Sequence, residues 1–282
     1  MKEKTVNRIN VTVIFTCFNR KEKSVNCIKK LVELNDTVNF SFIVVDDNST
    51  DGTKDAINSL KLNTNILEGD GTLFWCGGMR KGLDYYLKSN LDEDGFCLLV
   101  NDDVDFFEHS IDKMIVQLSN REDTVIVGAT CNDQGKFSYG LRRRVKGLKK
   151  GMVEAVPPES KEVVGETGNA NCVLIPNKIL VDVGNMDYTY KHNYGDYDFG
   201  FQITRKGYKL VSSLEFIGIC NDNPKKGRWM DTSLSRRERL KDKESPKGSP
   251  FKEAWHFALK NFGFVKAVRY TISPYIKILL GL

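Results

Sequence analysis

Residues 40–53 read FSFIVVDDNSTDGT, an apolar run that stops abruptly at two aspartates. The run is rich in β-branched and aromatic residues, so we predict a buried strand over residues 40–45. The polar residues that follow favour turns and helix caps, so a helix is expected to begin near Asp51. A strand that leads through a capped turn into a helix is the repeating unit of an α/β sheet.

The same pattern extends in both directions along the chain. Strands are predicted over residues 10–18, 96–100, 124–129, 171–175 and 209–219, and helices over residues 21–34, 77–87, 110–118 and 198–206. This alternation indicates a mostly parallel, right-handed sheet. In such sheets the ligand lies at the carboxyl ends of the strands. Residues 142–161, with RRR and PP, are predicted to be a surface loop.

The composition is that of a soluble globular protein, with 282 residues, 40% hydrophobic and 28% charged. From residue 225 onward there are 14 Lys and Arg against 5 Asp and Glu, whereas the preceding residues carry 28 against 32. We therefore expect an acidic catalytic domain over residues 1–224 and a basic helical extension over residues 225–282. A basic extension favours an anionic partner.

The cysteines and the N-terminus indicate a cytoplasmic protein. The seven cysteines are scattered without a CxxC pair, a pattern that argues against zinc ribbons and disulfide frameworks. Their apolar surroundings suit small hydrophobic side chains in a reducing compartment. The N-terminal residues lack the apolar core of a secretory signal, and no run of 18 apolar residues predicts a membrane-spanning helix.

Four polar clusters follow predicted strands or open a predicted helix. They are TCFNR at 16–20, DDNSTDGT at 46–53, NDDVD at 101–105 and NYGDYDF at 193–199. Each could be a simple turn or helix cap. However, carboxylates crowded at a strand end repel one another, and a divalent cation would relieve that repulsion. A carboxylate that opens a helix is favoured by the helix dipole, and it could also act as a general base.

Taken in order, TCFNR, VVDDNSTDGT, GDGTLFWCGGMRKG, LVNDDV and YGDYDFGFQITRKGY resemble the motifs of family-2 inverting glycosyltransferases. The WCGGMR and GDYDFG stretches look most like bacterial rhamnosyltransferase-type members. The resemblance covers about residues 10–220. It implies the A-type glycosyltransferase fold, with a Rossmann-like, mostly parallel sheet and helices on both faces, to which the C-terminal helical tail is added.

The resemblance also implies a site and a reaction. The donor would be a nucleotide-diphosphate sugar, and Mn²⁺ or Mg²⁺ the cofactor. The implied donor contacts are Thr16, Phe18, Arg20 and Asp46 for the nucleoside, Gly78 and Arg80 for the diphosphate or ribose, and Asp102 for the sugar or ribose. Asp103 would hold the metal and Asp196 would be the catalytic base. Trp75, His192 and Asp198 are candidates for the acceptor side, although Trp75 could equally be a core residue.

The sequence departs from the family pattern at two positions. Relatives commonly have Glu immediately before the catalytic Asp, and Gly195 stands there in this chain. Many relatives also have a histidine after the last strand, sometimes as a metal ligand. The corresponding residues 219–224 contain no histidine, and Asn221, Asp222 or water would have to replace it.

The tail and the remaining partners complete the expectations. Residues 254–280 are aromatic, apolar and basic, which suits either an anionic membrane surface or packing on the catalytic domain or a second copy. The resemblance favours a glycan or lipid-linked acceptor and thus the membrane. No nucleic-acid fold signature is present. The alternatives are a nucleotidyltransferase, although its glycine-rich loop is missing, and a non-catalytic carbohydrate- or nucleotide-binding protein. A dinucleotide-dependent oxidoreductase is disfavoured because GxGxxG is absent.

Overall fold

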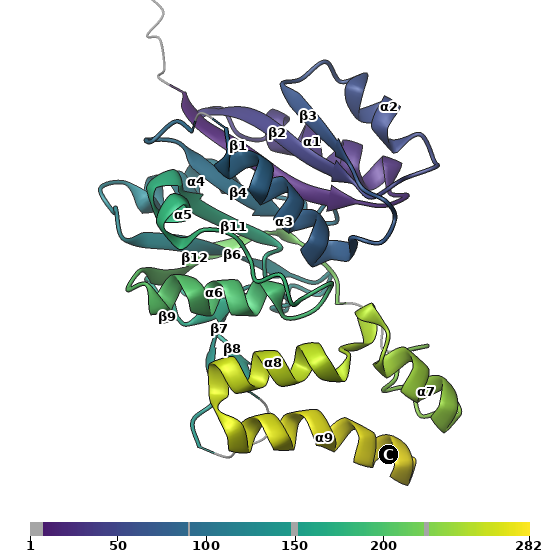
Figure 1. The fold of residues 1–282 in the computed structure, drawn as a ribbon. Coiled ribbons are helices and arrows are strands. Elements are labelled where there is room, and N and C mark those ends of the chain that lie inside the picture. The colour runs from purple at the N-terminus through teal and green to yellow at the C-terminus, as the bar shows by residue number, and fades with distance from the viewer. Residues whose placement is uncertain (1–7, 90, 148–151, 223–225) are drawn as a thin grey trace, which may run out of the picture.

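A nine-stranded sheet forms the centre of the computed structural model, which describes residues 8–89, 91–147, 152–222 and 226–282 (Figure 1). Its strands are β1 (Ile9–Cys17), β2 (Val38–Asp46), β3 (Thr64–Glu68), β4 (Phe96–Val100), β5 (Asp105–Phe106), β6 (Thr124–Cys131), β9 (Val164–Gly165), β11 (Cys172–Pro176) and β12 (Lys209–Ile219). Their order is β3-β2-β1-β4-β11-β6-β12-β5, and β9 pairs with β12 off this path.

Most of the strands run in one direction, as predicted. β1, β2, β3 and β4 are parallel neighbours, and β6 is parallel to β12. β11 is antiparallel to both β4 and β6. Its two neighbours therefore run in the same direction as each other, and β11 runs in the opposite direction. The short strands β5 and β9 are also antiparallel to β12.

Helices cover both faces of the sheet, which confirms the predicted architecture. They are α1 (Lys21–Glu33), α2 (Thr53–Asn58), α3 (Phe74–Leu87), α4 (Ser110–Leu118), α5 (Asn177–Val183) and α6 (Gly195–Arg205). Because side chains alternate along a strand, Val13 and Phe15 join an apolar cluster with α1 and α4, whereas Ile14 joins the cluster with α3, α5 and α6. All seven cysteines are buried free thiols within these layers.

The prediction of a surface loop over residues 142–161 is wrong. β7 (Leu141–Arg144) and β8 (Val153–Ala155) lie in this region and form a second, antiparallel sheet with β10 (Thr167–Gly168). The guanidinium of Arg144 lies 4.4 Å from the centre of the Phe201 ring, so the basic residue packs on an aromatic face of α6. The basic run therefore did not indicate a loop. Residues 148–151 lie outside the described part of the chain.

The C-terminal segment is helical, as expected, and packs on the catalytic layers through one face. It contains α7 (Arg236–Lys243), a 3-10 turn η1 (Pro246–Gly248), α8 (Phe251–Phe262) and α9 (Phe264–Leu280), and α8 lies beside α6 (Figure 1). Ala254, Phe257 and Ala258 of α8 belong to the same apolar cluster as α3 and α6. The expected boundary at 224/225 lies outside the described residues. Within the described ranges, no helix combines the length and the apolarity needed to span a membrane.

Candidate active site

The predicted polar clusters meet at one edge of the central sheet. β1, β2 and β4 are parallel, and Cys17 at the end of β1 pairs with Asp46 at the end of β2. The antiparallel strand β11 begins at this edge, because Cys172 pairs with Val100 at the end of β4. The edge therefore collects residues that follow three strands and residues that precede a fourth.

The ends of β1 and β2 are joined by reciprocal hydrogen bonds. The backbone N–H of Asn19 donates to Ser49 Oγ at 2.8 Å, and the backbone N–H of Thr50 donates to Asn19 Oδ1 at 2.8 Å. Beside this link, 52% of Phe18 is exposed, so its ring is open to stacking. The hydroxyl of Thr16 donates to the backbone oxygen of Val45 at 3.0 Å. The exposed Phe18 ring is thus carried by a loop that hydrogen bonds hold in place.

The two aspartates that end β2 organise the surrounding loops. Asp46 is buried, and its Oδ1 accepts from the backbone N–H of Ser49 at 2.9 Å. Asp47 is also buried and accepts from the backbone N–H groups of Gly71 at 2.8 Å and Phe74 at 3.1 Å. Asp47 therefore fixes the loop that leads into α3.

Arg20 binds both aspartates that follow β4. Its Nη1 donates to Asp102 Oδ1 at 2.5 Å, and its Nη2 donates to Asp103 Oδ2 at 3.0 Å. Ser24 Oγ donates to the second oxygen of Asp102 at 2.7 Å. Burial raises the pKa of Asp102, although Arg20 and Ser24 oppose the rise. Both oxygens of Asp102 are thus engaged, whereas Asp103 keeps 27% of its side chain exposed.

The surroundings of Asp103 fit a metal ion that has few ligands from the protein. Asp103 Oδ1 lies 3.8 Å from Cys220 Sγ, in the segment where the sequence resemblance implied a histidine. Burial raises the pKa of Cys220 to about 12. Sulfur is also a poor ligand for Mg²⁺ or Mn²⁺, which prefer oxygen. Asn221 is bound to Asp133 through both side-chain polar atoms. Within the described residues, no three His, Cys, Asp or Glu side chains form a metal cluster. A Mg²⁺ or Mn²⁺ ion held by one carboxylate, water and donor phosphates suits this set.

Asp196 lies in the first turn of α6 and reaches this edge of the sheet through Asn169, which precedes β11. Its Oδ1 accepts from the backbone N–H of Tyr197 at 2.8 Å, and its Oδ2 accepts from Asn169 Nδ2 at 3.3 Å. Burial raises the pKa of this half-buried carboxylate to about 6. Asp196 is therefore ionised at neutral pH but is more basic than an ordinary aspartate.

Trp75 and Gly195 connect the two halves of the site. Trp75 Nε1 donates to Asn101 Oδ1 at 2.7 Å, beside the Arg20 cluster. Gly195 precedes Asp196, and a Cβ added there would lie 2.1 Å from Cys76 Sγ. The absence of Glu at this position thus has a steric explanation, because α3 occupies the space that its side chain would need.

Gly78 and Arg80 face structural neighbours. A Cβ on Gly78 would lie 2.2 Å from Thr16 Oγ1, so glycine permits α3 to approach β1. Arg80 Nη1 donates to the backbone oxygen of Asp187 at 3.1 Å and also to that of Tyr190. Contacts of Gly78 and Arg80 with a diphosphate or ribose remain predictions.

The two other acceptor candidates differ in their surroundings. Burial lowers the pKa of His192 to about 4, and its ring meets that of Phe74 edge-on, with centroids 6.3 Å apart. Asp198 is fully buried and accepts hydrogen bonds from Lys260 and Asn261 of α8. Their contact with an acceptor stays a prediction, and the observed partners of Asp198 belong to the tail.

The sequence assigned no role to several residues of the site, although Asp47 and Asn101 lie within the quoted clusters. Asn171 Nδ2 donates to Cys220 Sγ at 3.4 Å. The residues without an assigned role are Ser24, Asp47, Asn101, Asn169, Asn171 and Cys220. Asn101 stands next to Asp102, and this adjacency was an available signal. Asn169 and Asn171 precede β11, and only the reversed direction of that strand brings them to the carboxyl edge.

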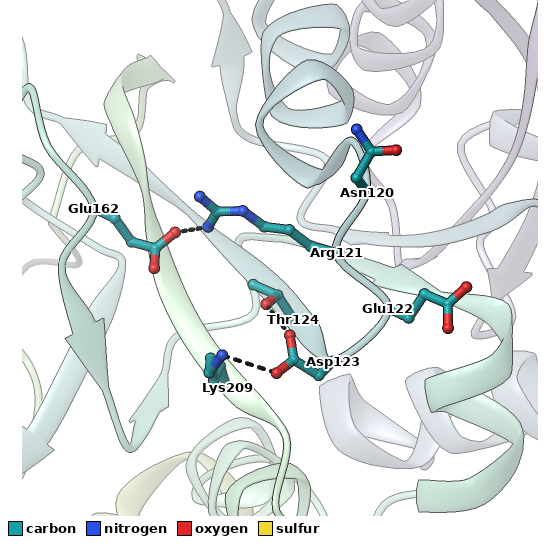
Figure 2. A pocket seen from close by; sticks show the side chains of 7 residues that line it. All are labelled: Asn120, Arg121, Glu122, Asp123, Thr124, Glu162 and Lys209. Atoms are coloured by element: carbon teal, nitrogen blue, oxygen red, sulfur yellow. Dashed lines mark hydrogen bonds and ion pairs between the residues drawn. The ribbon is translucent and has the colours of Figure 1, made fainter.

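Two hollows lie away from this edge. A polar hollow of about 610 Å³ lies where β6 and β12 begin, and its Arg121–Glu162 and Asp123–Lys209 ion pairs leave each cation with a partner (Figure 2). An apolar hollow of about 720 Å³ lies between α4 and β12. Neither contains the predicted site residues, so the assignment depends on the strand-end geometry.

Comparison with known proteins agrees with this geometry. The model of the glycosyl transferase family 2 matches residues 12–174. Among solved structures, the chain is similar to the mannosyltransferase PcManGT from Pyrobaculum calidifontis, described in complex with GDP-Man and Mn²⁺. The TM-score is 0.57 at 14% identity, over 97% of this chain and 74% of that one, which shows a common fold. The search of curated proteins found no significant match.

The contact between Gly195 and Cys76 predicts a coupled pair. Gly195→Ala should lower the free energy of unfolding by about 1–3 kcal/mol, because the new methyl overpacks the contact. In a Cys76→Ala background the loss should shrink, giving a coupling energy of about 0.5–3 kcal/mol. Urea denaturation of the four proteins measures this coupling, and strictly additive effects would contradict the assigned contact.

Proposed function

Because the chain belongs to glycosyl transferase family 2, we propose that it moves a sugar from a nucleotide-diphosphate sugar to an acceptor hydroxyl with inversion. The observation that carries the proposal is the placement of the Arg20–Asp102–Asp103 cluster and Asp196 at one sheet edge. The first group suits the donor, and the second suits activation of the acceptor.

On the donor side, we propose that Phe18 stacks on the base and that Thr16 and Asp46 contact the nucleoside. The exposure of Phe18 and the braced loop beneath it support this assignment. Asp102 would meet the ribose or sugar. Asp103 would hold Mg²⁺ or Mn²⁺, which when bound would neutralise charge on the diphosphate as it leaves.

On the acceptor side, Asp196 would accept the proton of the attacking hydroxyl. That oxygen then forms a bond to the anomeric carbon while the bond from this carbon to the diphosphate oxygen breaks. Attack opposite the leaving group inverts the anomeric centre, and the proton remains on Asp196 until it passes to solvent. The raised pKa of Asp196 supports this role, because a base near the working pH removes protons more effectively.

The finer assignment also follows the resemblance. We propose a hexosyl or rhamnosyl donor, and a glycan or lipid-linked acceptor in bacterial surface polysaccharide synthesis. GDP-mannose is the first donor to test, because the similar mannosyltransferase was described with GDP-Man.

Donor binding is tested first by thermal shift with UDP, GDP, dTDP and CDP, each with and without Mn²⁺ or Mg²⁺. One diphosphate should stabilise the protein in a metal-dependent way, by about 2.7 kcal/mol at 100 times its Kd. Asp103→Asn should remove the metal-dependent part, whereas Asp55→Asn, in the exposed first turn of α2, should not. A folded protein stabilised by none of the four would instead favour a non-catalytic binding protein.

Asp196→Asn should reduce kcat by about 10²–10⁴-fold while nucleoside diphosphate binding is kept. In the wild type, kcat should fall below pH about 6, where Asp196 becomes protonated. The raised pKa also means that the ionised carboxylate costs stability above pH 6, and that this cost vanishes below the unfolded-state value of about 4. Asp196→Asn should therefore be more stable than wild type at pH 8 but not at pH 4.

These pH dependences are measured by donor turnover and by urea denaturation at both pH values. Activity of Asp196→Asn close to that of the wild type would exclude it as the base. A wild-type rate that is flat from pH 5 to 8 would contradict the same assignment.

We also propose that the outer face of α9 contacts an anionic membrane surface. Val265, Ile272, Ile276 and Leu279 follow helical spacing and are 44–64% exposed. The tail that carries them has a large excess of Lys and Arg, including exposed Lys277 beside the stripe. An apolar helix face flanked by cations matches interfacial binding to acidic lipids.

Sedimentation with vesicles should show binding to phosphatidylcholine–phosphatidylserine mixtures and much less to phosphatidylcholine alone. Replacing Ile272 and Ile276 by Ser should weaken this binding. Val116→Ser removes an apolar side chain that is 71% exposed on α4 and should have no effect. Equal binding of all variants, or a dimer that is lost with the same two changes, would argue against the membrane role.

A further inference from the structure

The loop before α6 and the first turn of α6 are held by residues of the C-terminal segment. We propose that Lys260 of α8 is a positioning residue that fixes the direction of Asp196 through its neighbour Asp198. The inference rests on the proposed role of Asp196 as the base. It makes the tail a working part of the acceptor half of the site.

Lys260 connects a carboxylate in the loop before α6, Asp187, with one in the first turn of α6, Asp198. Its Nζ donates to Asp198 Oδ2 at 2.6 Å and to Asp187 Oδ2 at 2.8 Å. Asn261 Nδ2 donates to Asp198 Oδ1 at 2.8 Å, and Asn261 Oδ1 accepts from Arg205 Nη1 at 2.6 Å. Both oxygens of Asp198 are therefore bound by adjacent residues at the end of α8.

Helix geometry explains how this grip controls Asp196. Residues two apart in an α-helix project about 200° from one another, so Asp196 and Asp198 lie on opposite sides of α6. Asp196 meets Asn169 of the site, and Asp198 meets α8. Fixing Asp198 from behind prevents the first turn from rotating about its axis, and so fixes where Asp196 points.

Burial makes this clamp costly to break. Only 1% of the Asp198 side chain is exposed, so its charge requires hydrogen-bonded partners. Lys260 is 30% exposed, and although burial opposes the charge, its two carboxylate partners raise the pKa of Lys260. His256 of α8 also meets Asp187, at 2.9 Å. Without Lys260, Asp198 Oδ2 loses its partner, and Asp198 Oδ1 keeps Asn261 and the guanidinium of Arg205 at 3.8 Å. We expect the first turn of α6 to shift so that Oδ2 regains a partner or reaches water.

The entry into α6 is held by the same segment. Tyr194 has φ 68°, a left-handed conformation that is costly for a bulky residue and must be held by its surroundings. Its ring stacks on Phe257 of α8 with centroids 4.8 Å apart, and its hydroxyl pairs with Ser249. The preceding Asn193 donates to the backbone oxygen of Pro246 at 3.0 Å. Pro246, Ser249 and Phe257 thus hold the segment immediately before Asp196 through three contacts.

Lys260→Met in the full-length protein tests the proposal, with Lys252→Met as the control on an exposed position of the same helix. The substrate is GDP-mannose, or the hexose or rhamnose derivative of whichever diphosphate stabilises the protein. Its slow hydrolysis, with water in place of the acceptor hydroxyl, gives kcat. Lys260→Met should lower kcat by about 10²-fold, as expected for a misplaced catalytic group, with the Kd for the nucleoside diphosphate unchanged. Lys260→Arg should recover most of the activity.

The pH profile separates positioning from stability. If Asp196 swings toward water in Lys260→Met, its pKa should return toward the ordinary value, so the fall in kcat on the acid side should move below pH 6. The double variant Asp198→Asn with Lys260→Met leaves no unpaired carboxylate at this position and should show the same loss of kcat in a stably folded protein.

Each outcome has a defined reading. The positioning role alone would be overturned if either Lys260→Met or the double variant folds, keeps the wild-type kcat and shows the same fall in kcat on the acid side. This conclusion requires that Asp196→Asn is inactive. A loss of kcat that is matched by an equal loss of nucleoside diphosphate binding would also overturn the positioning role. Wild-type protein that hydrolyses no nucleotide sugar would overturn the proposed function, and this inference with it.

Discussion

Three glycines without room for a Cβ set the distances on which the site depends. Gly78 and Gly82 face Thr16 and Ile14 of β1, and Gly195 of α6 faces Cys76 of α3. α3 is therefore pressed against the central sheet on one side and against the first turn of α6 on the other. The proposed donor and acceptor halves therefore have α3 between them, and their separation follows from the close contacts of these glycines with neighbouring side chains.

The carboxylates near the site differ in how far their side chains are exposed. Asp47, Asp102 and Asp198 give their oxygens to loop N–H groups, to Arg20 with Ser24, and to α8. Asp103 and Asp196 also accept hydrogen bonds, from Arg20 and from Asn169 with the backbone of Tyr197, but their side chains are more exposed. In the proposed function the three buried carboxylates act as braces and the two more exposed ones meet ligands.

The helices and strands that depend on local sequence pattern were predicted well. The helix over residues 110–118 and the strand over 209–219 have the predicted bounds, because their periodicity and flanking residues agree. β3 and α5 were missed, since the first is only partly buried and the second is a short helix. The direction of β11 is set by pairing across the sheet, and this hid Asn169 and Asn171. The partners of Asp198 are more than 60 residues away in the sequence. A pattern of neighbouring residues could not predict them.

The clamp on α6 also bears on synthesis of the chain. A nascent polypeptide that has emerged only to residue 245 contains every strand of the central sheet, yet it lacks Lys260, Asn261 and Phe257. Domains tend to fold from the N-terminus during synthesis, so the nucleotide half can form before the support for α6 exists. Competence for transfer would then arise late in translation, which keeps a partly made enzyme from consuming activated sugar.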